Sequence, residues 1–538
     1  MIEKFIKGIK YRLNEETLTA EIIHRKSYMG DFIIPETVKL NKVSYLVTSI
    51  GLEAFFECSS LTSIVIPNSV KSIGKGAFGG CTSLTSVVIP DSVESIGGEA
   101  FLYCFSLTSI VIPDSVTSIG ERAFDNCTAL TSIDVDANNA NYCSVDGVLF
   151  NKDKTTLIQY PRGKQCAYTI PDSVTSIGRD AFFGCESITS VTIPHSVTSI
   201  GRDAFCACES LTSVTIGNGV TSIGSRAFSG CKSLTSVTIG NGLTSIGAEA
   251  FWNCSSLTSI TIPNSVTEIG DYAFYKCTAL TSIIIPNSVT EIGDHAFDEC
   301  TALTSINVDA NNPNYCSVDG VLFNKDKTTL IQYPRGKQGA YTIPDSVTSI
   351  GENTFYNCTS LASVTIPDSV TSIGKEAFRD CTSLTSVTIP DSMTSIGCGA
   401  FSGCKSLTSV TIPDSVTSIG CGAFSDCKSL TSVTIGDGVT SIGSSAFQSC
   451  SSLTSITIPN SVTSIESWVF ARCESITSVT IPHSVTSIES RAFYECKSLV
   501  VIKYNGTIEQ WEKIEFDTYQ NKNITTNIIH CTDGDVSM

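Results

Sequence analysis

Charged residues are scarce in this 538-residue sequence, in which only 16% of the residues are Asp, Glu, Lys or Arg. The 34 basic residues are outnumbered by 52 acidic ones, so the net charge is −18, and no basic run occurs. A protein that binds nucleic acid or an anionic membrane needs clustered Lys and Arg to displace counterions. The composition therefore argues against nucleic acid and anionic lipid as partners.

Long apolar runs are missing as well. No stretch of 18 or more apolar residues occurs, so we expect no segment that inserts into a membrane. Residues 1–16 alternate charged and apolar residues and lack the apolar core of a secretion signal. The sequence leaves the location open between a chain that stays inside, one that leaves by another route, and one whose natural start lies upstream.

The residues and motifs of common catalytic sites are also few. There are five His, and neither H-E-x-x-H nor G-x-S-x-G occurs. His195 and His483 occupy a repeat position that holds Asp172 or Asn264 in other repeats, which is typical of a solvated turn. We therefore expect no catalytic residue, no cofactor and no enzymatic activity.

What the sequence does have is a 23-residue period. The residue that best marks it is a Phe that usually follows Ala, at positions 55, 78, 101, 124, 182, 205, 228, 251, 274, 297, 355, 378, 401, 424, 447, 470 and 493. A Cys follows three residues after each of these Phe, from Cys58 to Cys496. A repeat of 20 to 29 residues is typical of a solenoid, in which each turn buries its apolar face against its neighbours.

One repeat shows how such a turn would fold. The segment Ile188-Thr-Ser-Val-Thr-Ile193 fits the strand pattern L-x-x-L-x-L of a leucine-rich repeat, and Pro194 would end that strand. Ile188, Val191 and Ile193 would point inward, and Val197 and Ile200 would return to the core. Gly201 would permit a tight corner. We predict a right-handed β-solenoid or horseshoe with a parallel sheet and little helix.

Two interruptions and two ends complete the predicted organisation. The Phe spacing jumps from 23 to 58 twice, because near-identical 35-residue inserts lie near 136–170 and 309–343. Each insert reads as a β-hairpin with a five-residue turn, and the pair indicates duplication of a 173-residue block. We predict an N-terminal cap with a degenerate turn at 1–50, a solenoid at 51–498, and a C-terminal cap at 499–538 covered by Tyr504, Trp511, Ile514 and Phe516.

These patterns carry a family resemblance. The string C-x-S-L-T-S-V-T-I-P-D-S-V-T-S-I-G-x-x-A-F, present at 381–401 apart from Met393, resembles the BspA-like leucine-rich repeats of surface proteins from host-associated microbes. The inserts (SVDGVLFNKDKTTLIQYP) and the tail (IKYNGTIEQWEKI with HCTDGD) are similar to elements of the same family. The resemblance implies a surface or secreted protein with an adhesin-like role, which binds host matrix or partner-cell proteins.

The 24 cysteines do not predict metal or disulfide chemistry. Seventeen lie in one repeat column, whereas zinc needs four ligands that converge on a point. Neighbours in a column have Cβ atoms nearer 4.8 Å apart than the ~3.8 Å that a disulfide prefers. Cys143 and Cys166 could pair in the first insert, but the second insert has Cys316 and Gly339 there. We expect a buried thiol column, no metal site and no disulfide.

The outward side of the predicted sheet is the candidate binding surface. It carries a Ser column from Ser63 to Ser478 and a second column that begins with Val65, Val88 and Val111. Thr fills the second column at Thr192, Thr215, Thr238, Thr261, Thr365, Thr388, Thr411, Thr434, Thr457 and Thr480, a set we call the threonine row. Strand propensity and hydroxyl ladders between neighbours would explain these residues without any function.

If the outward side has a function, we expect contact with protein, with the three Val residues as an apolar anchor. Two alternatives stay open. One is an intracellular interaction scaffold. The other, more remote, is a Ser/Thr lattice that binds ice, although Asp134 and Asn307 break its regularity. The sequence does not identify the partner or the oligomeric state.

Overall fold

The computed structural model describes residues 1–24, 28–165, 167–516 and 528–537. The chain divides into two compact units. Unit 1 comprises Met1–Thr278 and Glu291–Asp298, and unit 2 comprises Ala279–Thr290 and Glu299–Met538.

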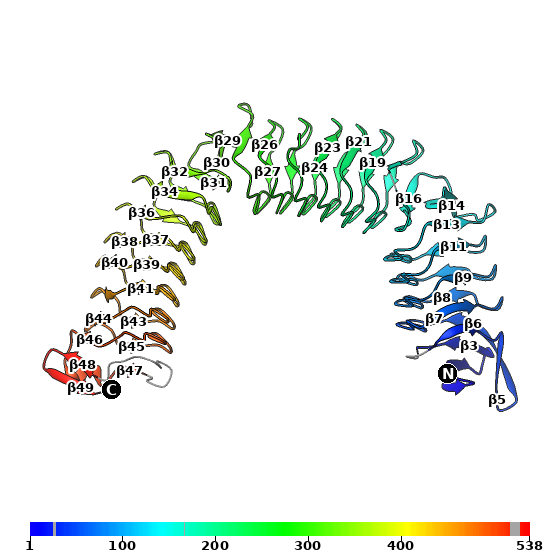
Figure 1. Cartoon of the computed structure of the whole chain (residues 1–538), viewed down its shortest axis with the longest axis horizontal. Helices are drawn as coiled ribbons and strands as arrows, with labels where there is room; N and C mark the ends of the chain where they lie inside the picture. The colour runs from blue at the N-terminus through cyan, green and yellow to red at the C-terminus, as the bar shows by residue number, and fades with distance from the viewer. Residues whose placement is uncertain (25–27, 166, 517–527, 538) are drawn as a thin grey trace. The chain divides into compact units, whose positions relative to one another are not determined.

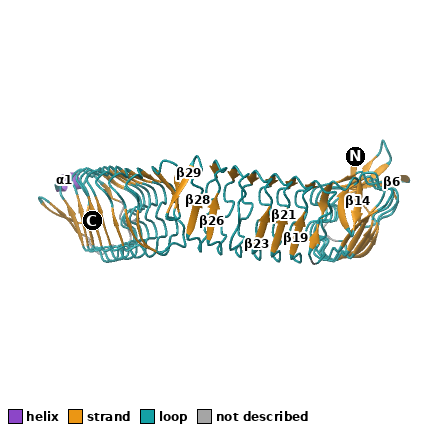
Figure 2. Cartoon of the chain, turned by 90° about the horizontal axis from the view of Figure 1, so that it is seen from above, coloured by secondary structure: helices purple, strands orange, loops and turns teal. Residues whose placement is uncertain are grey.

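Each unit is a parallel β-solenoid built from turns of about 23 residues. Most turns carry two short strands, one usually with the sequence Ser-Val-Thr-Ile and the other with the sequence Ser-Ile. Each strand pairs with the equivalent strand of the next turn (Figures 1 and 2). Identical residues therefore lie side by side, as in Val191 opposite Val214 and Thr192 opposite Thr215. The predicted repeat solenoid with a parallel sheet and little helix is confirmed.

The longer strands form the first face. In unit 1 they are β7 Leu61–Val65, β9 Ser86–Val88, β11 Ser109–Ile112, β13 Ser132–Val135, β17 Tyr168–Thr169, β19 Ser190–Ile193, β21 Ser213–Ile216 and β23 Ser236–Ile239. In unit 2 they are β26 Ser282–Ile285, β28 Ser305–Val308, β32 Gly339–Thr342, β34 Leu361–Thr365, β36 Ser386–Thr388, β38 Ser409–Ile412, β40 Ser432–Ile435, β42 Ser455–Thr457, β44 Ser478–Ile481 and β46 Val501–Tyr504.

The two-residue strands form the second face. In unit 1 they are β8 Ser72–Ile73, β10 Ser95–Ile96, β12 Ser118–Ile119, β18 Ser176–Ile177, β20 Ser199–Ile200, β22 Ser222–Ile223, β24 Ser245–Ile246, β25 Glu268–Ile269 and β27 Glu291–Ile292. In unit 2 they are β33 Ser349–Ile350, β35 Ser372–Ile373, β37 Ser395–Ile396, β39 Ser418–Ile419, β41 Ser441–Ile442, β43 Ser464–Ile465, β45 Ser487–Ile488 and β47 Glu515–Phe516. The sequence did not predict this second ladder.

The core consists of stacked columns. Phe rings of successive turns lie parallel, as in Phe205 and Phe228, whose centroids are 5.0 Å apart at an interplanar angle of 3°. After each insert, a Tyr restarts the column, because Tyr160 stacks on Phe182 and Tyr333 lies against Phe355, both at 4.9 Å. Apart from the interruptions at the inserts, each Phe contacts its copies one turn away, and these contacts help to join the turns.

The corner glycines allow close approach between turns, and Gly201 is one whose φ angle is not positive. A Cβ atom on Gly201 would lie 2.7 Å from the carbonyl carbon of Gly178 in the preceding turn. The positive φ angles fall elsewhere, two residues before and two after the Phe, as in Asp203 (φ 54°) and Ala207 (φ 58°). The tight turn around Phe205 therefore depends on two left-handed residues, neither of which is glycine.

The inserts are hairpins that join the second face. In the first, β14 Tyr142–Val145, β15 Val148–Asn151 and β16 Thr156–Gln159 pair antiparallel, and β16 then pairs parallel with β18. In the second, β29 Tyr315–Val318, β30 Val321–Asn324 and β31 Thr329–Gln332 repeat this arrangement. The hairpin turn at 152–155 has four residues instead of the expected five, because Asn151 still belongs to β15.

The ends carry irregular elements. At the N-terminus are β1 Ile2–Ile6, β2 Ile9–Asn14, β3 Thr19–Ile22, β4 Gly30–Ile33, β5 Thr37–Leu40 and β6 Val43–Ile50. At the C-terminus are α1 Ile508–Trp511, β48 Ile528–Cys531 and β49 Gly534–Ser537, where Tyr504, Trp511 and Ile514 are buried. The side chain of Phe516 lies outside the described residues. Within the described part of the chain, no helix has the length and apolar character that crossing a bilayer requires.

Candidate functional site

The predicted outward residues point to the outer side of the first face. Every member of the threonine row is exposed except Thr480, which is half-buried. Thr192, Thr215 and Thr238 are in register on β19, β21 and β23 in unit 1. In unit 2, the paired members are Thr365 with Thr388, Thr411 with Thr434, and Thr457 with Thr480. Thr169 and Thr342, which the sequence analysis missed, each extend a row by one rung.

Thr261 is the one member of the threonine row that does not lie on a strand, which corrects its predicted place on the sheet. Its side chain is exposed and those of Ile260 and Ile262 are buried, as the alternation predicts, but residues 257–263 form no strand. Among the described residues, β23 pairs only with β21, and β26 pairs only with β28. A strand needs backbone hydrogen bonds to its neighbours as well as alternating burial, and the ladder of the first face is interrupted at this turn. Thr261 therefore does not extend the ladder of paired threonines on β19, β21 and β23.

Hydroxyl groups outside the threonine row form hydrogen bonds that connect adjacent turns. The Oγ1 of Thr212 donates to the carbonyl oxygen of Thr189 at 2.9 Å, and that of Thr221 donates to Thr198 at 3.1 Å. Ser115 donates in the same way to the carbonyl of Val93 at 2.7 Å. Each of these bonds joins residues 22 or 23 positions apart, so each bridges one turn to the next.

The hydroxyl groups of the threonine row do not connect adjacent turns in this way. Within the described chain, its hydroxyl groups make no hydrogen bond to protein atoms, whereas Thr212, three residues before Thr215, does. The hydroxyl ladder that we weighed as a purely structural explanation therefore does not form in this column. A free hydroxyl can both donate and accept a hydrogen bond, so the row presents unused bonding capacity to solvent or to a partner.

Next to this polar surface, unit 1 carries an apolar strip formed by Ile33, Val65, Val88 and Val111. Their exposed fractions are 71%, 53%, 74% and 58%. Ile33 on β4 is opposite Val65, and Val65 is opposite Val88, so the side chains lie on successive rungs. The sequence analysis predicted the three Val residues but missed Ile33, and it also missed Ile284 of unit 2, which is 63% exposed.

Acidic side chains lie at both ends of the apolar strip. Asp31, two residues before Ile33, accepts hydrogen bonds from Ser63 Oγ at 2.7 Å and Thr62 Oγ1 at 2.9 Å. These two bonds lower the pKa of Asp31, so its carboxylate is charged at neutral pH. At the other end, Asp134 lies opposite Val111 on β13. The strip is therefore an apolar surface bracketed by negative charge.

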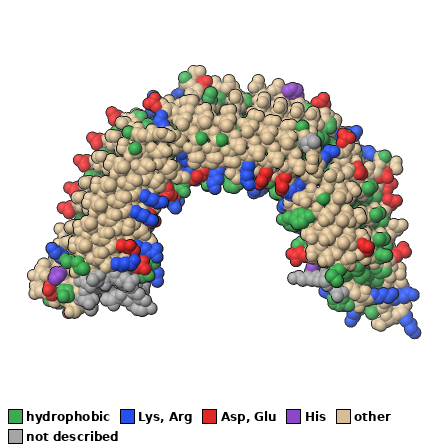
Figure 3. All heavy atoms as spheres, in the orientation of Figure 1, with side chains coloured by type: hydrophobic (Ala, Val, Ile, Leu, Met, Phe, Trp, Pro, Cys, Tyr) green, Lys and Arg blue, Asp and Glu red, His purple; other side chains and the backbone are tan. Residues whose placement is uncertain are grey.

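Charged side chains are unevenly distributed over the surface that Figure 3 shows. Figure 3 shows Lys, Arg, Asp and Glu along the edges of the face in view, while its middle carries mostly uncharged atoms. Many of them pair from turn to turn, as Lys232 with Glu209 and Lys497 with Glu474 do, at 2.7 and 2.8 Å. Exposed pairs of this kind contribute little to stability.

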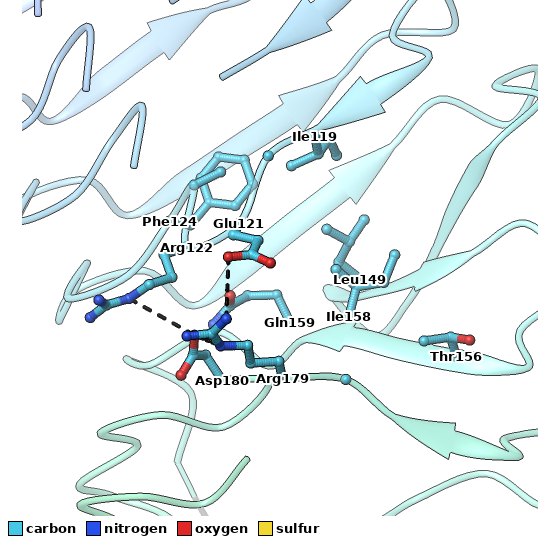
Figure 4. A pocket seen from close by; sticks show the side chains of 13 residues that line it. Ile119, Glu121, Arg122, Phe124, Leu149, Thr156, Ile158, Gln159, Arg179 and Asp180 are labelled. Carbon is cyan, nitrogen blue, oxygen red and sulfur yellow. Dashed lines mark ion pairs between the residues drawn. The ribbon is translucent and has the colours of Figure 1, made fainter. Parts of the chain in front are cut away.

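A small cavity of about 220 Å³ opens in unit 1 beside the first insert (Figure 4). Phe124, Leu149 and Ile158 form its apolar part. Charged groups that pair with one another line the rest. Arg179 lies 3.5 Å from both Glu121 and Asp180, and Arg122 lies 3.9 Å from Asp180. The charged groups that line the cavity are therefore paired with one another.

Three carboxylates beside this cavity are buried, namely Asp125, Asp180 and Asp203. Burial, and after it the charge of Asp125, raise the pKa of Asp180 to about 6 against the opposing effect of Arg122. Arg122 is bound more closely to Asp125, with its Nε 2.6 Å from Oδ2. These buried carboxylates therefore destabilise the folded chain at the place where the first insert interrupts the Phe column.

Comparison with known proteins identifies the family. The model for the BspA type leucine rich repeat region (6 copies) matches residues 48–162, 164–238, 198–318, 337–454 and 394–525. The chain belongs to the BspA-type leucine-rich-repeat family. The predicted family, with its repeats and solenoid, is thus confirmed. A search of the curated proteins found no match.

Several solved structures resemble this BspA-type chain. A leucine-rich repeat protein from Eubacterium ventriosum is 27% identical over 74% of this chain and 98% of that chain, with a TM-score of 0.53. One from Bacteroides ovatus is 31% identical over 77% and 95%, with a TM-score of 0.44. A leucine rich cell surface protein from Faecalibacterium prausnitzii is 28% identical over 96% and 98%, with a TM-score of 0.42.

The cysteine column of this BspA-type chain is buried, and most of its thiols are hydrogen-bonded to backbone. Cys404 Sγ donates to the carbonyl oxygen of Phe378 at 3.2 Å, and the same bond recurs through most of the column. Burial raises the pKa of Cys381 and of Cys427 to about 12, so these thiols stay protonated and unreactive. The sequence analysis predicted the column but not this bond.

The cysteines of the inserts lie apart from the column. Cys143 and Cys316 are half-buried and donate to the carbonyls of Asn151 and Asn324, both at 3.2 Å. Cys166, the candidate partner of Cys143, lies outside the described residues. None of the described cysteines is in a disulfide, and no group of three or more His, Cys, Asp or Glu among the described residues could hold a metal ion.

Proposed function

We propose that this BspA-type chain is a non-catalytic, adhesin-like recognition protein that binds other proteins through the outer side of its first face. The observation that carries the proposal is the contrast between two kinds of Thr. The hydroxyl of Thr212 holds two turns together, whereas those of Thr192, Thr215 and Thr238 are unused within the described chain. A regular surface with unused hydroxyls and an exposed apolar strip has the polar and apolar parts of a protein interface.

The size of the face indicates an extended contact. Strands of about four residues at 3.3 Å each, on rungs about 4.8 Å apart, offer about 60 Å² of flat sheet per turn. A typical stable complex buries about 800 Å² on each partner, so an interface here would span on the order of ten turns. The partner is therefore expected to be a protein surface or a long segment, and not a small molecule.

The composition of the apolar strip indicates which kind of protein would bind there. Ile33, Val65, Val88 and Val111 form the strip, and the carboxylates of Asp31 and Asp134 lie at its ends. We propose that the strip docks an apolar segment flanked by Lys or Arg, on a host matrix protein or a partner-cell surface protein. The net charge of −18 would favour the approach of such a basic partner.

The test is binding of the full chain to a panel of purified extracellular-matrix and cell-surface proteins, measured by biolayer interferometry. For any protein that binds, a triple variant Val65→Asp, Val88→Asp, Val111→Asp is expected to weaken binding more than about tenfold, or 1.4 kcal/mol. Val500→Asp is the matched control, because Val500 is 49% exposed but lies outside the strip. Circular dichroism checks that each variant stays folded.

Two results would contradict the proposal. If the triple variant stays folded and binds as well as the unchanged chain, the strip is not the contact. If the Val500 variant loses affinity to the same extent, the effect is one of added charge and not of the strip. Binding that does not weaken with added salt would remove the role of Asp31 and Asp134.

A further inference from the structure

Two cysteines of unit 2 differ from all the others that are described. Cys398 and Cys421 are exposed, and they are the only exposed cysteines among the described residues. They are 23 positions apart, so they occupy the same place in adjacent turns, just after the paired strands β37 and β39. The two turns are also bonded here, because the Gly399 N–H donates to the carbonyl oxygen of Cys421 at 2.8 Å.

The two thiols also interact with each other. Burial raises the pKa of Cys421, and the charge of Cys398 and a hydrogen bond to it raise that pKa further. Two groups affect each other in this way only when they are neighbours. Both side chains are open to solvent, so a small disulfide in solution can reach them.

We propose that Cys398 and Cys421 form a surface dithiol that reacts with small-molecule disulfides and closes into a disulfide between adjacent turns. Cα atoms on stacked rungs lie about 4.8 Å apart, within the range that a disulfide spans. The Cβ atoms must approach by up to about 1 Å from that rung spacing. The backbones of the two turns are already in close contact here, because a Cβ on Gly420, next to Cys421, would clash with the backbone nitrogen of Cys398.

The reaction is a thiol–disulfide exchange in two steps. One protein thiolate attacks a small disulfide R–S–S–R, forms a mixed disulfide and expels R–S⁻. The second protein thiol, as its thiolate, attacks the protein-side sulfur of that mixed disulfide and expels the second R–S⁻. The two released thiolates take up the two protons that the protein thiols lost. Two protein thiols and one R–S–S–R thus become one protein disulfide and two R–S–H.

The buried column provides an internal comparison. Cys404 and Cys427 lie 23 positions apart in the same two turns, but both are buried and donate to backbone carbonyls at 3.2 Å. Their spacing is that of Cys398 and Cys421, yet their thiols are inaccessible and stay protonated. If the spacing between turns alone decided reactivity, both pairs would react with a small disulfide. If exposure to solvent decides reactivity, only Cys398 and Cys421 react.

The experiment uses the reduced full chain and oxidised glutathione. After the reaction, accessible thiols are blocked with one alkylating reagent, the chain is denatured, and the remaining thiols are labelled with a second. Trypsin then releases fragments 380–405 and 406–428, which carry Cys398 and Cys421 respectively. We expect the loss of two thiols per chain and a cross-link between these fragments, with Cys404 and Cys427 carrying the second label. Dithiothreitol should reduce the cross-link and restore both thiols.

Single variants give a second readout. Cys398→Ser and Cys421→Ser should fold, because Ser225 and Ser444 occupy the same place in other turns. Each variant is expected to stop at a stable mixed disulfide with one glutathione, because no second thiol resolves it. The proposal is overturned if the unchanged chain also accumulates glutathione without a cross-link. It is equally overturned if neither cysteine reacts, or if Cys404 and Cys427 form the bridge instead.

Discussion

Replacing Asp180 with Asn should stabilise unit 1, by an amount that grows between about pH 4 and pH 6 and stays constant above that range. Asp180 is 6% exposed, and burial raises its pKa from 3.8 to about 6. The folded chain therefore binds more protons than the unfolded chain between these pH values, so the unfolding free energy falls as pH rises through this window. Asn carries no charge, and the duplicated block already has Asn353 at the corresponding position.

The size of the effect follows from the pKa and the ion pairs. A pKa raised from 3.8 to about 6 corresponds to about 3 kcal/mol of unfolding free energy at neutral pH. The attraction of Asp180 to Arg122 and Arg179, at 3.9 and 3.5 Å, lowers the pKa and is already included in this shift. The net gain for Asn is therefore about 3 kcal/mol above pH 6.5, or roughly 6–12 °C in melting temperature.

The assay is thermal unfolding by far-ultraviolet circular dichroism at several pH values from 4 to 7.5. The quantity compared is the difference in melting temperature between the Asp180→Asn variant and the unchanged chain, because charges elsewhere affect both equally. This difference should be near zero at pH 4 and should grow through pH 6. Asp172→Asn, at an exposed turn, is the control and should show no such growth. A variant that is less stable above pH 6 would refute the reasoning, since ion pairing would then outweigh burial.

Three further predictions concern the turn itself, each measured as the urea midpoint of unfolding. Thr212→Ala should cost about 1 kcal/mol because its hydroxyl bonds the preceding turn, whereas Thr215→Ala should cost almost nothing; equal losses would contradict this distinction. Gly201→Ala should cost about 1–3 kcal/mol because its Cβ would meet Gly178 at 2.7 Å, and an unchanged midpoint would remove close approach as the reason for glycine. Phe401→Ala should cost about 3–5 kcal/mol through the cavity it leaves in the ring stack, and a loss under 1 kcal/mol would mean that the stack closes up.

The repeat made most of the fold predictable. A fixed period of 23 places each residue beside its own copy, so Phe205 must meet Phe228, and Thr192 must meet Thr215, once the turns stack. The alternation in Ile188–Ile193 likewise separated inward from outward side chains. For this reason the columns and the outer side of the first face could be read from the sequence.

The two-residue strands, the left-handed residues and the contacts across the inserts had no signal of this kind in the sequence. The strand Ser199–Ile200 is too short for any alternation to show, and the positive φ of Asp203 falls on a residue type that does not demand it. The contact between Arg122 and Asp180 joins two turns that an insert separates in the sequence. Ile33 had a signal that was overlooked, because Ile33-Ile34-Pro35 matches Val65-Ile66-Pro67 although its turn lacks the Phe and Cys.

The missing strand at Thr261 shows the limit of the repeat as a predictor. Residues 255–264 have the same sequence as residues 451–460, yet only the second copy forms a strand, β42, which carries Thr457. Local sequence sets which side chains point inward, and in both copies it does so correctly. Strand pairing depends in addition on where the backbone of the adjacent turn lies, which the letters of one turn do not specify.

The bonds that run from each turn to the next also decide how the protein would respond to pulling. Thr212 bonds to Thr189 and Cys404 to Phe378, so bonds of this kind join each turn to the turn beside it. Under tension, turns would peel away one after another instead of resisting together. Each lost turn of about 23 residues would release about 75 Å of extended chain. The chain would then lengthen in small steps while the rest of its turns stay folded.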